Sequence, residues 1–339
     1  MIVFRADGGS RMGLGHIMRL MTIADSVKKQ NKEVLFVLAD TETASLVEER
    51  GFAFRVLNSR YDDMEGELPR LLPLLEEEKA EMILADSYFV TPKYLSTLKK
   101  QLKTVYMDDL AAFSYDVDVL INYNIYAQDL DYKRLEEQGT KLLLGCQYMP
   151  LRAGFCNRDY AIKEEAANIL ISTGGSDSFG IAEKILSTVL SDERLKEKTY
   201  HVVCGAANTS LPKLKEMAAA RKNIVLHVNE KDMAELMQEM DLAVSAGGST
   251  MYELAAVGVP TICFSFADNQ KRLIRGFTQR GIARGGYDFM EDERGMLQGI
   301  LEDLQSLTEN PMERGQMSAK AKKLVDGQGA NRIAKILCR

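Results

Sequence analysis

The feature that most constrains the fold of this chain is a steady alternation of short, apolar, β-rich runs with helical patterns. Residues 33–39 and 81–87 are almost continuously apolar, whereas apolar residues in 16–30 recur every three or four positions, as on one face of a helix. A chain of alternating strands and helices folds into a parallel sheet with helices on both faces. We therefore expect an α/β fold whose strands are 2–7, 33–39, 52–57, 81–87, 103–109, 118–124, 167–175, 200–205, 223–229, 241–247 and 260–266.

The alternation pauses between Lys141 and Glu165, where a proline, a glycine and mixed charges are typical of a connector. A chain of 339 residues is also too long for one ordinary core. We expect two doubly wound, Rossmann-like domains that face a cleft, 1–150 and 151–339, with a last helix that can return to the N-terminal domain. After Gly286 the chain is expected to be mostly helical. Ligands of such folds bind outside the carboxyl ends of the strands.

Composition and charge exclude several classes of function. The formal net charge is −6 and no basic run forms a tail, which argues against nucleic-acid and anionic-membrane partners. No apolar stretch is long enough to span a membrane, and Arg5 and Asp7 stand where a signal peptide would be apolar. The five cysteines form no close pair, so neither a disulfide framework nor a zinc site is expected. We expect a cytoplasmic, monomeric protein without cofactor, metal or stable membrane insertion.

The stretch GGSRMGLGHIMR, residues 8–19, follows the first expected strand and leads into a helix. Its glycines let the backbone approach a ligand, and a helix start offers free N–H groups and a positive dipole end. Such a position suits phosphate or a developing oxyanion, and it favours a neutral His16 that could take a proton from water. The pattern leaves open whether His16 is a base or a capping and packing residue. The third glycine of a dinucleotide fingerprint is missing, and no Gly-Lys-Ser/Thr follows.

Two glycine-rich loops in the second half of the chain are candidate phosphate sites. Residues 172–180, STGGSDSFG, follow an expected strand, and their small side chains would either wrap an anionic group or form a plain turn. Residues 245–270 are more specific: a strand, Gly-Gly-Ser-Thr, a helix with Glu253 near its start, and a second strand before Asn269 and Gln270. A helix N-terminus binds phosphate, and a carboxylate one turn inside it can accept both hydroxyls of a ribose. This combination predicts a pocket for a nucleoside diphosphate.

Several motifs together resemble the PseG/SpsG family. The family pattern of Arg-x-Asp, Gly-x-Gly-His and an arginine three residues later is matched by Arg5, Asp7, Gly13, Gly15, His16 and Arg19. Further family-like pieces are DSY (86–88), YMDDLA (106–111), DVLINYN (118–124) and DGQGANRIAKIL (326–337). Residues 245–270 resemble the donor-nucleotide motif of GT-B proteins, particularly MurG-type glycosyltransferases. The resemblance covers nearly the whole chain and implies a GT-B fold.

The resemblance implies a hydrolase that releases a 2,4-diacetamido-2,4,6-trideoxyhexose from its UDP carrier in pseudaminic acid synthesis, without a metal. Water would attack the anomeric carbon with inversion, with His16 as the general base. Asp7 would orient His16 or hold the sugar, and Arg5 or Arg19 would support nearby loops or charge. UDP is a good leaving group, so charge stabilisation and a positioned water would suffice.

A UDP-sugar is therefore the expected partner. The resemblance also implies which residues contact each part of the substrate. Glu253 would bind the ribose, and the diphosphate would be bound by Gly175, Gly247, Gly248, Ser249 and Thr250. The uracil would be bound by Val228, Asn229 and Met233, and the sugar by Tyr88, Asn122, Asn269 and Gln270, while Gly13 and Gly15 would allow the sugar to approach.

Three other functions stay open. The same pocket would serve a GT-B glycosyltransferase. MurG-like transferases act at membranes and usually carry an apolar, basic patch, which the net negative charge of this chain does not favour. An SpsG-type protein of spore-coat or surface polysaccharide synthesis would act on a different UDP-sugar. A UDP-sugar-binding partner without catalysis is the third, and the presence of His16 and Asp7 argues against it.

Overall fold

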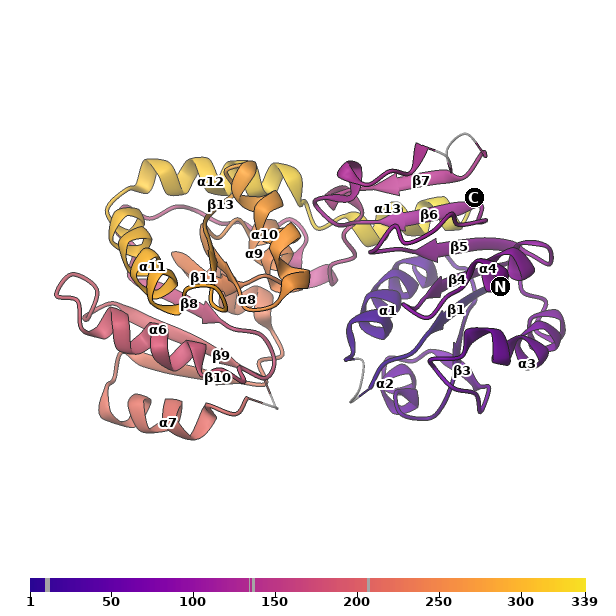
Figure 1. Cartoon of the computed structure of the whole chain (residues 1–339), viewed down its shortest axis with the longest axis horizontal. Helices are drawn as coiled ribbons and strands as arrows, with labels where there is room; N and C mark the ends of the chain where they lie inside the picture. Colours follow the sequence, from indigo (N-terminus) through magenta and orange to yellow (C-terminus); the bar gives the residue numbers. More distant parts are fainter. Residues whose placement is uncertain (10–12, 134, 136–137, 206–207) are drawn as a thin grey trace. The chain divides into compact units, whose positions relative to one another are not determined.

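The computed structural model describes residues 1–9, 13–133, 135, 138–205 and 208–339. They divide into two compact units, one of Met1–Arg152 with Gln328–Arg339 and the other of Ala153–Gly327. Each unit contains one parallel sheet flanked by helices (Figure 1). The expected α/β fold with two doubly wound parallel sheets is confirmed.

The first unit contains a seven-stranded sheet in the order β3-β2-β1-β4-β5-β6-β7, with every neighbouring pair parallel. Its strands are β1 (Ile2–Ala6), β2 (Val34–Leu38), β3 (Ala53–Val56), β4 (Met82–Asp86), β5 (Lys103–Met107), β6 (Val119–Asn122) and β7 (Lys141–Leu144). Its helices are α1 (Gly15–Lys28), α2 (Ala44–Glu49), α3 (Met64–Glu77), α4 (Pro92–Lys99) and α13 (Gly329–Leu337), with 3₁₀ turns η1 (Ala127–Asp129) and η2 (Cys146–Tyr148). Because the strands are parallel, the loops that follow them open at one edge of the sheet.

The sheet of the first unit has an apolar core on each face. Successive side chains of a strand point to opposite faces, so Phe4 of β1 packs in a cluster with α1 and α13, whereas Val3 packs in a cluster with α3 and α4. The C-terminal helix α13, yellow in Figure 1, places Ile333, Ala334 and Leu337 in the cluster of Phe4. The last helix of the chain is therefore part of the core of the first unit.

The second unit contains a six-stranded parallel sheet in the order β10-β9-β8-β11-β12-β13. Its strands are β8 (Asn168–Ser172), β9 (Thr199–Cys204), β10 (Ile224–Val228), β11 (Leu242–Ala246), β12 (Thr261–Ser265) and β13 (Ala283–Asp288). Its helices are α6 (Ile181–Leu190), α7 (Leu211–Ala220), α8 (Met233–Gln238), α9 (Ser249–Val257), α10 (Asp268–Gln279), α11 (Glu293–Thr308) and α12 (Pro311–Leu324), with the 3₁₀ turn η3 (Ala153–Phe155).

Each expected strand is present, with small differences in its bounds, but the sequence did not predict β7 or β13. β7 lies within the stretch interpreted as a connector, and its four residues at the sheet edge are too few to establish a period. β13 has the sequence ARGGYD, in which Gly285 and Gly286 have positive φ angles of 90° and 96°. A Cβ at Gly285 would lie 2.5 Å from the Cys263 carbonyl oxygen, so a close approach of two backbones requires glycine where a strand pattern would need an apolar side chain.

Candidate active site

In the first unit, β1 and β4 lie side by side although they are far apart in the sequence. The chain runs outward from β1 to β2 and β3 on one side and from β4 onward on the other, and ligands of such sheets bind at the carboxyl ends of the strands where the order reverses. His16 is the second residue of α1, which follows β1, and Asp86 is the last residue of β4. Asp86 is in register with Ala6, so both polar residues lie at the reversal point.

His16 and Asp86 form a hydrogen-bonded pair at this edge. Nδ1 of His16 lies 2.6 Å from Oδ1 of Asp86, and both side chains are almost completely buried. Burial alone would raise the pKa of Asp86, but the charge and hydrogen bonds of Arg19 and His16 outweigh it and lower the pKa to about 2. Nδ1 also lies 3.2 Å from Nη2 of Arg19. Asp86 is nearer and its ionised carboxylate can only accept, so the proton of a neutral His16 is assigned to Nδ1 and the lone pair to Nε2. Nε2 has no hydrogen-bond partner among the described residues and is not enclosed.

Arg19 connects this pair to the next strand. Its Nε and Nη2 donate to the two oxygens of Asp86 at 2.5 and 2.6 Å, and its Nη1 donates to Oδ2 of Asp109 at 2.9 Å and to the Tyr123 hydroxyl at 2.6 Å. Burial disfavours the charge of Arg19, but Asp86, Tyr123 and Asp109 outweigh it and raise its pKa. Arg19 therefore fixes the position of Asp86 and supplies a permanent positive charge beside His16.

Tyr88 follows β4 and lies against the imidazole. Its ring meets that of His16 edge to face, with centroids 4.5 Å apart, and about half of the residue is exposed. The hydroxyl is 3.4 Å from Oδ2 of Asp109. Burial of the hydroxyl and the Asp109 carboxylate raise the pKa of Tyr88 to about 12, so the phenol stays protonated near neutral pH. The exposed part of Tyr88 is available to a ligand next to His16.

Arg5 and Asp7 form a separate buried network. Arg5 is completely buried and donates to both oxygens of Glu67, at 2.8 and 2.6 Å, and to Oδ2 of Asp7 at 2.5 Å. The other oxygen of Asp7 accepts the backbone N–H of Ala39 at 2.7 Å. Both oxygens of Asp7 are thus used within the protein, and the carboxylate beside His16 is Asp86.

The ends of β5 and β6 carry a second group of polar residues. Asp108 accepts from the Leu110 and Ala111 N–H groups and from the hydroxyls of Tyr115 and Tyr132, so it closes its own loop. Asp109 instead points to the network of Arg19 and also accepts from Nδ2 of Asn124 at 2.8 Å.

The glycines of the opening stretch lie in front of α1. Gly9 and Gly13 exchange two backbone hydrogen bonds, at 3.0 and 2.8 Å, which closes the loop on itself. An added Cβ at Gly13 or at Gly15 would meet no described atom within 4 Å. Among the described residues, nothing occupies this space beside the start of α1; residues 10–12 of the same stretch lie outside the described residues.

In the second unit the order of strands reverses between β8 and β11, and a glycine-rich loop follows each of them. Gly248 is the cap residue of α9, and no side chain of the described residues caps this helix. The first amides of α9 are therefore free to bind an anion, and an added Cβ at Gly248 would meet nothing within 4 Å in the described part of the chain. The N-terminus of α6 differs, because the carboxylate of Asp177 accepts the N–H groups of Ile181 and Ala182 at 2.8 and 3.2 Å.

The other residues expected to contact the nucleotide or sugar lie along the carboxyl edge of the same sheet or on the helices that start there. Val228 ends β10 with 43% of its surface exposed, and Asn229 follows in a left-handed conformation with φ of 54°. Gln270 is turned inward, and its Oε1 accepts the Phe266 N–H at 2.9 Å. The structure places the remaining members as follows: Gly175 after β8, Met233 at the start of α8, Gly247 after β11, Ser249, Thr250 and Glu253 in the first turns of α9, and the exposed Asn269 in the first turn of α10.

Sequence reasoning missed Asp86 and Asn124 as site residues, and for Asp108 and Asp109 it left open whether they bind polar groups of the substrate or cap a loop. These residues lie in the DSY, YMDDLA and DVLINYN motifs, of which only Tyr88 and Asn122 were expected to contact the sugar. Asn122 is completely buried at the end of β6, where it contacts Asn124 and Tyr132.

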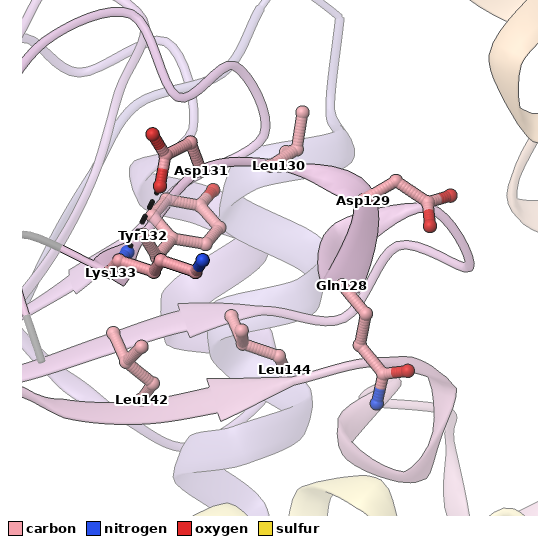
Figure 2. Close-up of a pocket in the computed structure, with 8 residues that line it drawn as sticks. All are labelled: Gln128, Asp129, Leu130, Asp131, Tyr132, Lys133, Leu142 and Leu144. Atoms are coloured by element: carbon pink, nitrogen blue, oxygen red, sulfur yellow. Dashed lines mark hydrogen bonds between the residues drawn. The ribbon is translucent and has the colours of Figure 1, made fainter.

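An open pocket of about 410 Å³ also lies in the first unit, lined by Gln128–Lys133, Leu142 and Leu144 (Figure 2). Figure 2 shows Leu142 and Leu144 of β7 below the loop that carries Tyr132. None of the expected site residues lines this pocket. Among the described residues, no three His, Cys, Asp or Glu side chains are grouped so that they could hold a metal ion. No described helix is both long and apolar enough to cross a membrane.

Comparisons with known proteins agree with this picture. Residues 169–334 match the glycosyltransferase family 28 C-terminal domain. The chain is 25% identical to the spore coat polysaccharide biosynthesis protein SpsG of Bacillus subtilis, over 98% of this chain and 96% of that protein. It is 27% identical to the UDP-2,4-diacetamido-2,4,6-trideoxy-beta-L-altropyranose hydrolase of Campylobacter jejuni, over 85% of this chain and 97% of that one. The expected resemblance to PseG/SpsG proteins is confirmed.

The solved structure of Acinetobacter baumannii MurG has the same fold. It superposes with a TM-score of 0.71 over 99% of both chains, at 14% sequence identity. The GT-B fold that the sequence motifs implied is thereby confirmed.

Proposed function

We propose that this chain hydrolyses a UDP-linked sugar to UDP and the free sugar, by attack of water at the anomeric carbon. The observation that supports this most strongly is the state of His16, whose Nδ1 is held by Asp86 at 2.6 Å and whose Nε2 has no partner among the described residues. A histidine whose tautomer is fixed in this way is a base directed outward from its carboxylate. Its place at the carboxyl edge of the sheet is where a ligand is expected.

In the proposed step, Nε2 of His16 takes one proton from water while the water oxygen bonds to C1 of the sugar. The bond between C1 and the bridging phosphate oxygen breaks, and UDP leaves with that oxygen and the electron pair. Attack from the face opposite UDP inverts the configuration at C1. The imidazolium that forms is stabilised by Asp86, and its proton then passes to solvent. UDP is a good leaving group, so the proposed step requires neither a general acid nor a metal.

The second unit would hold the nucleotide. The uncapped N-terminus of α9, from Gly248 to Thr250, would bind the diphosphate with its backbone amides. Glu253, one turn further along, would accept the ribose hydroxyls. The exposed end of β10 at Val228 and Asn229 would bind the uracil. Binding negative charge at this helix also stabilises the charge that develops on UDP as it leaves.

The substrate that we propose is a UDP-linked 2,4-diacetamido-2,4,6-trideoxyhexose, which places the chain in a pseudaminic acid-type pathway. Similarity to the Campylobacter jejuni hydrolase over most of both chains supports this choice. The similarity to SpsG extends over a larger share of this chain at nearly equal identity, which favours a different UDP-sugar as the second candidate.

The test is release of UDP from a panel of UDP-diacetamido-trideoxy sugars without any acceptor, with the anomer of the first product resolved by NMR. We expect turnover in water alone, inversion at C1, and a loss of about 100-fold or more in His16→Ala. The matched control is His201→Ala: His201 lies on β9, with its Nδ1 3.0 Å from Nε2 of His227, and we expect wild-type turnover. Retention at C1, or an undiminished rate in His16→Ala, would contradict the proposal.

Transfer to an acceptor is the competing function, and the match to a glycosyltransferase domain favours it. The same assay separates the two. A glycosyltransferase would release UDP slowly in water and faster when its acceptor is added.

A further inference from the structure

Asn122 and Asn124, two residues apart at the end of β6, have different environments. Asn122 is completely buried, donates from Nδ2 to the Tyr132 hydroxyl at 2.9 Å, and accepts at Oδ1 from both the backbone N–H and Nδ2 of Asn124, at 3.0 and 2.9 Å. A side-chain oxygen that accepts from the N–H two residues later fixes a turn. Asn122 therefore sets the conformation in which Asn124 is presented.

The hydrogen bonds of Asn124 define which way its amide points. Its Nδ2 donates to Oδ1 of Asp109 at 2.8 Å and to Oδ1 of Asn122 at 2.9 Å. A carboxylate oxygen can only accept, so the nitrogen of the amide must face Asp109, and its two N–H groups are both used. The carbonyl Oδ1 is left facing away from these partners.

This carbonyl has no donor. Asn124 is only 7% exposed, yet among the described residues nothing donates to its Oδ1. In the described part of the chain, the fully enclosed side-chain polar atoms that lack a partner are Thr173 Oγ1 and Asn208 Nδ2. Oδ1 of Asn124 is not among them, so it is accessible to solvent. A nearly buried acceptor without a donor is unfavourable unless water or a ligand supplies one.

Asn124 belongs to the same polar network as the proposed base. Asp109 accepts from Arg19 and Asn124 together, and Arg19 binds Asp86, which holds His16. Both oxygens of Asp109 are used within the protein, so Asp109 is a positioning residue. The carbonyl of Asn124 lies in this network at the carboxyl edge of the sheet, and no described residue donates to it.

We propose that Asn124 determines sugar specificity, by accepting at Oδ1 a hydrogen bond from a donor group of the sugar, either a hydroxyl or an amide N–H. The inference rests on the proposed function, because it assigns a sugar to this edge. A site built to pair with a donor rejects a sugar that lacks it, since the protein acceptor is then left unpaired.

The test is calorimetric titration of the wild type, Asn124→Ala and Asn124→Leu with UDP and with a non-hydrolysable UDP-linked 2,4-diacetamido-2,4,6-trideoxyhexose, in which a methylene group replaces the bridging oxygen at C1. Analogues of this ligand in which fluorine replaces the 2-acetamido, 3-hydroxyl or 4-acetamido group are titrated in the same way. The control is Asn331→Ala on α13, outside the network. We expect one replacement to weaken wild-type binding about tenfold, in line with one lost buried hydrogen bond. The same replacement should change binding less than twofold in both Asn124 variants. A loss at position 2 or 4 identifies an amide N–H, and a loss at position 3 identifies a hydroxyl.

Wild-type hydrogen exchange in β1 and β6 of the Asn124 variants shows that the first unit, which contains Asn124, is folded. If UDP binds and the variants discriminate between the analogues as the wild type does, or the wild type does not discriminate, the role of Asn124 is wrong while the proposed function survives. If UDP itself does not bind to the wild type, the proposed function fails and this inference with it.

Discussion

A histidine becomes a directed base only when something fixes its tautomer, and at the residue scale that role belongs to Asp86. The carboxylate is buried, ionised and held by two hydrogen bonds from Arg19, so it cannot turn away from Nδ1 of His16. Asp7 is also buried, but its two oxygens accept from Arg5 and the Ala39 N–H. The two aspartates should therefore respond differently to the same substitution.

In Asp86→Asn we expect kcat to fall by about 10²- to 10⁴-fold, because an amide can donate to Nδ1 and move the imidazole proton to Nε2. KM and the affinity for UDP should change little. Steady-state kinetics of UDP release measure this, with Asp7→Asn as the matched control. Asp7→Asn should lower the melting temperature but leave kcat per folded enzyme near the wild-type value. An equal fall of kcat in both variants would contradict the assignment of Asp86.

Asp86 should also contribute to acid stability. Its pKa in the folded protein, about 2, is below the ordinary value of 3.8, so its stabilisation is complete above about pH 4 and is lost as the pH falls toward 2. A shift of this size corresponds to about 2 kcal/mol of unfolding free energy. Urea unfolding at pH 5 and pH 2.5 should therefore show a larger loss in the wild type than in Asp86→Asn. Equal losses would mean that the carboxylate is not held as described.

The sequence indicated His16 and Tyr88 but could not indicate the carboxylate partner of His16. Asp7 lies near His16 in the sequence, whereas Asp86 becomes its neighbour only because β4 pairs with β1. Likewise, nothing in the INYN pattern distinguishes a buried Asn122 from a presented Asn124. Both distinctions depend on strand order and on backbone hydrogen bonds that the sequence alone does not specify.

At the scale of elements, the important contrast is between two helix starts in the second unit. α6 begins with its amides bound to Asp177, whereas α9 begins at Gly248 without a side-chain cap among the described residues. Both starts follow glycine-rich loops, so the sequence predicted two similar anion sites. Asp177 within STGGSDSFG was the residue that could have shown the difference, since a carboxylate shortly before a helix can accept the first N–H groups of that helix.

Gly247 and Gly248 form a matched pair for testing α9. A Cβ at Gly247 would lie 2.8 Å from Cδ1 of Ile274 and 2.9 Å from Cβ of Gln270, whereas a Cβ at Gly248 would meet no described atom within 4 Å. We expect Gly247→Ala to lower the unfolding free energy by about 1–3 kcal/mol through overpacking against α10. Gly248→Ala should lower it by less than about 1 kcal/mol but weaken UDP binding tenfold or more, because the methyl group occupies ligand space.

Thermal unfolding and calorimetric titration with UDP measure the two effects separately. Wild-type affinity for UDP in Gly248→Ala would show that the diphosphate does not lie at the start of α9.

At the scale of the whole molecule, the chain leaves the first unit at Arg152 and returns to it at Gln328. The returning helix α13 is strongly amphipathic: Ile333 and Leu337 are buried in the core of the first unit, while Lys335 is exposed. Local periodicity predicts such a helix, but only the packing of α13 against α1 shows which unit it stabilises.

Ile333→Ala should therefore destabilise the first unit by about 2–4 kcal/mol, the usual loss for removing a large buried aliphatic side chain. Lys335→Ala, on the exposed face of the same helix, should change stability by less than about 0.5 kcal/mol. Hydrogen exchange resolved along the sequence should show faster exchange in β1 and α1 of Ile333→Ala and little change in β8 and β11. Faster exchange confined to the second unit would contradict the assignment of α13.

The central claim is that His16 directs water to C1 of a UDP-linked sugar. The most direct measurement is hydrolysis of a UDP-linked 2,4-diacetamido-2,4,6-trideoxyhexose in ¹⁸O-labelled water without an acceptor, followed by mass spectrometry of both products. We predict one ¹⁸O atom at C1 of the released sugar, none in UDP, and loss of product formation in His16→Ala. Label in the β-phosphate of UDP would mean that water attacks phosphorus, and it would contradict the mechanism proposed for this site.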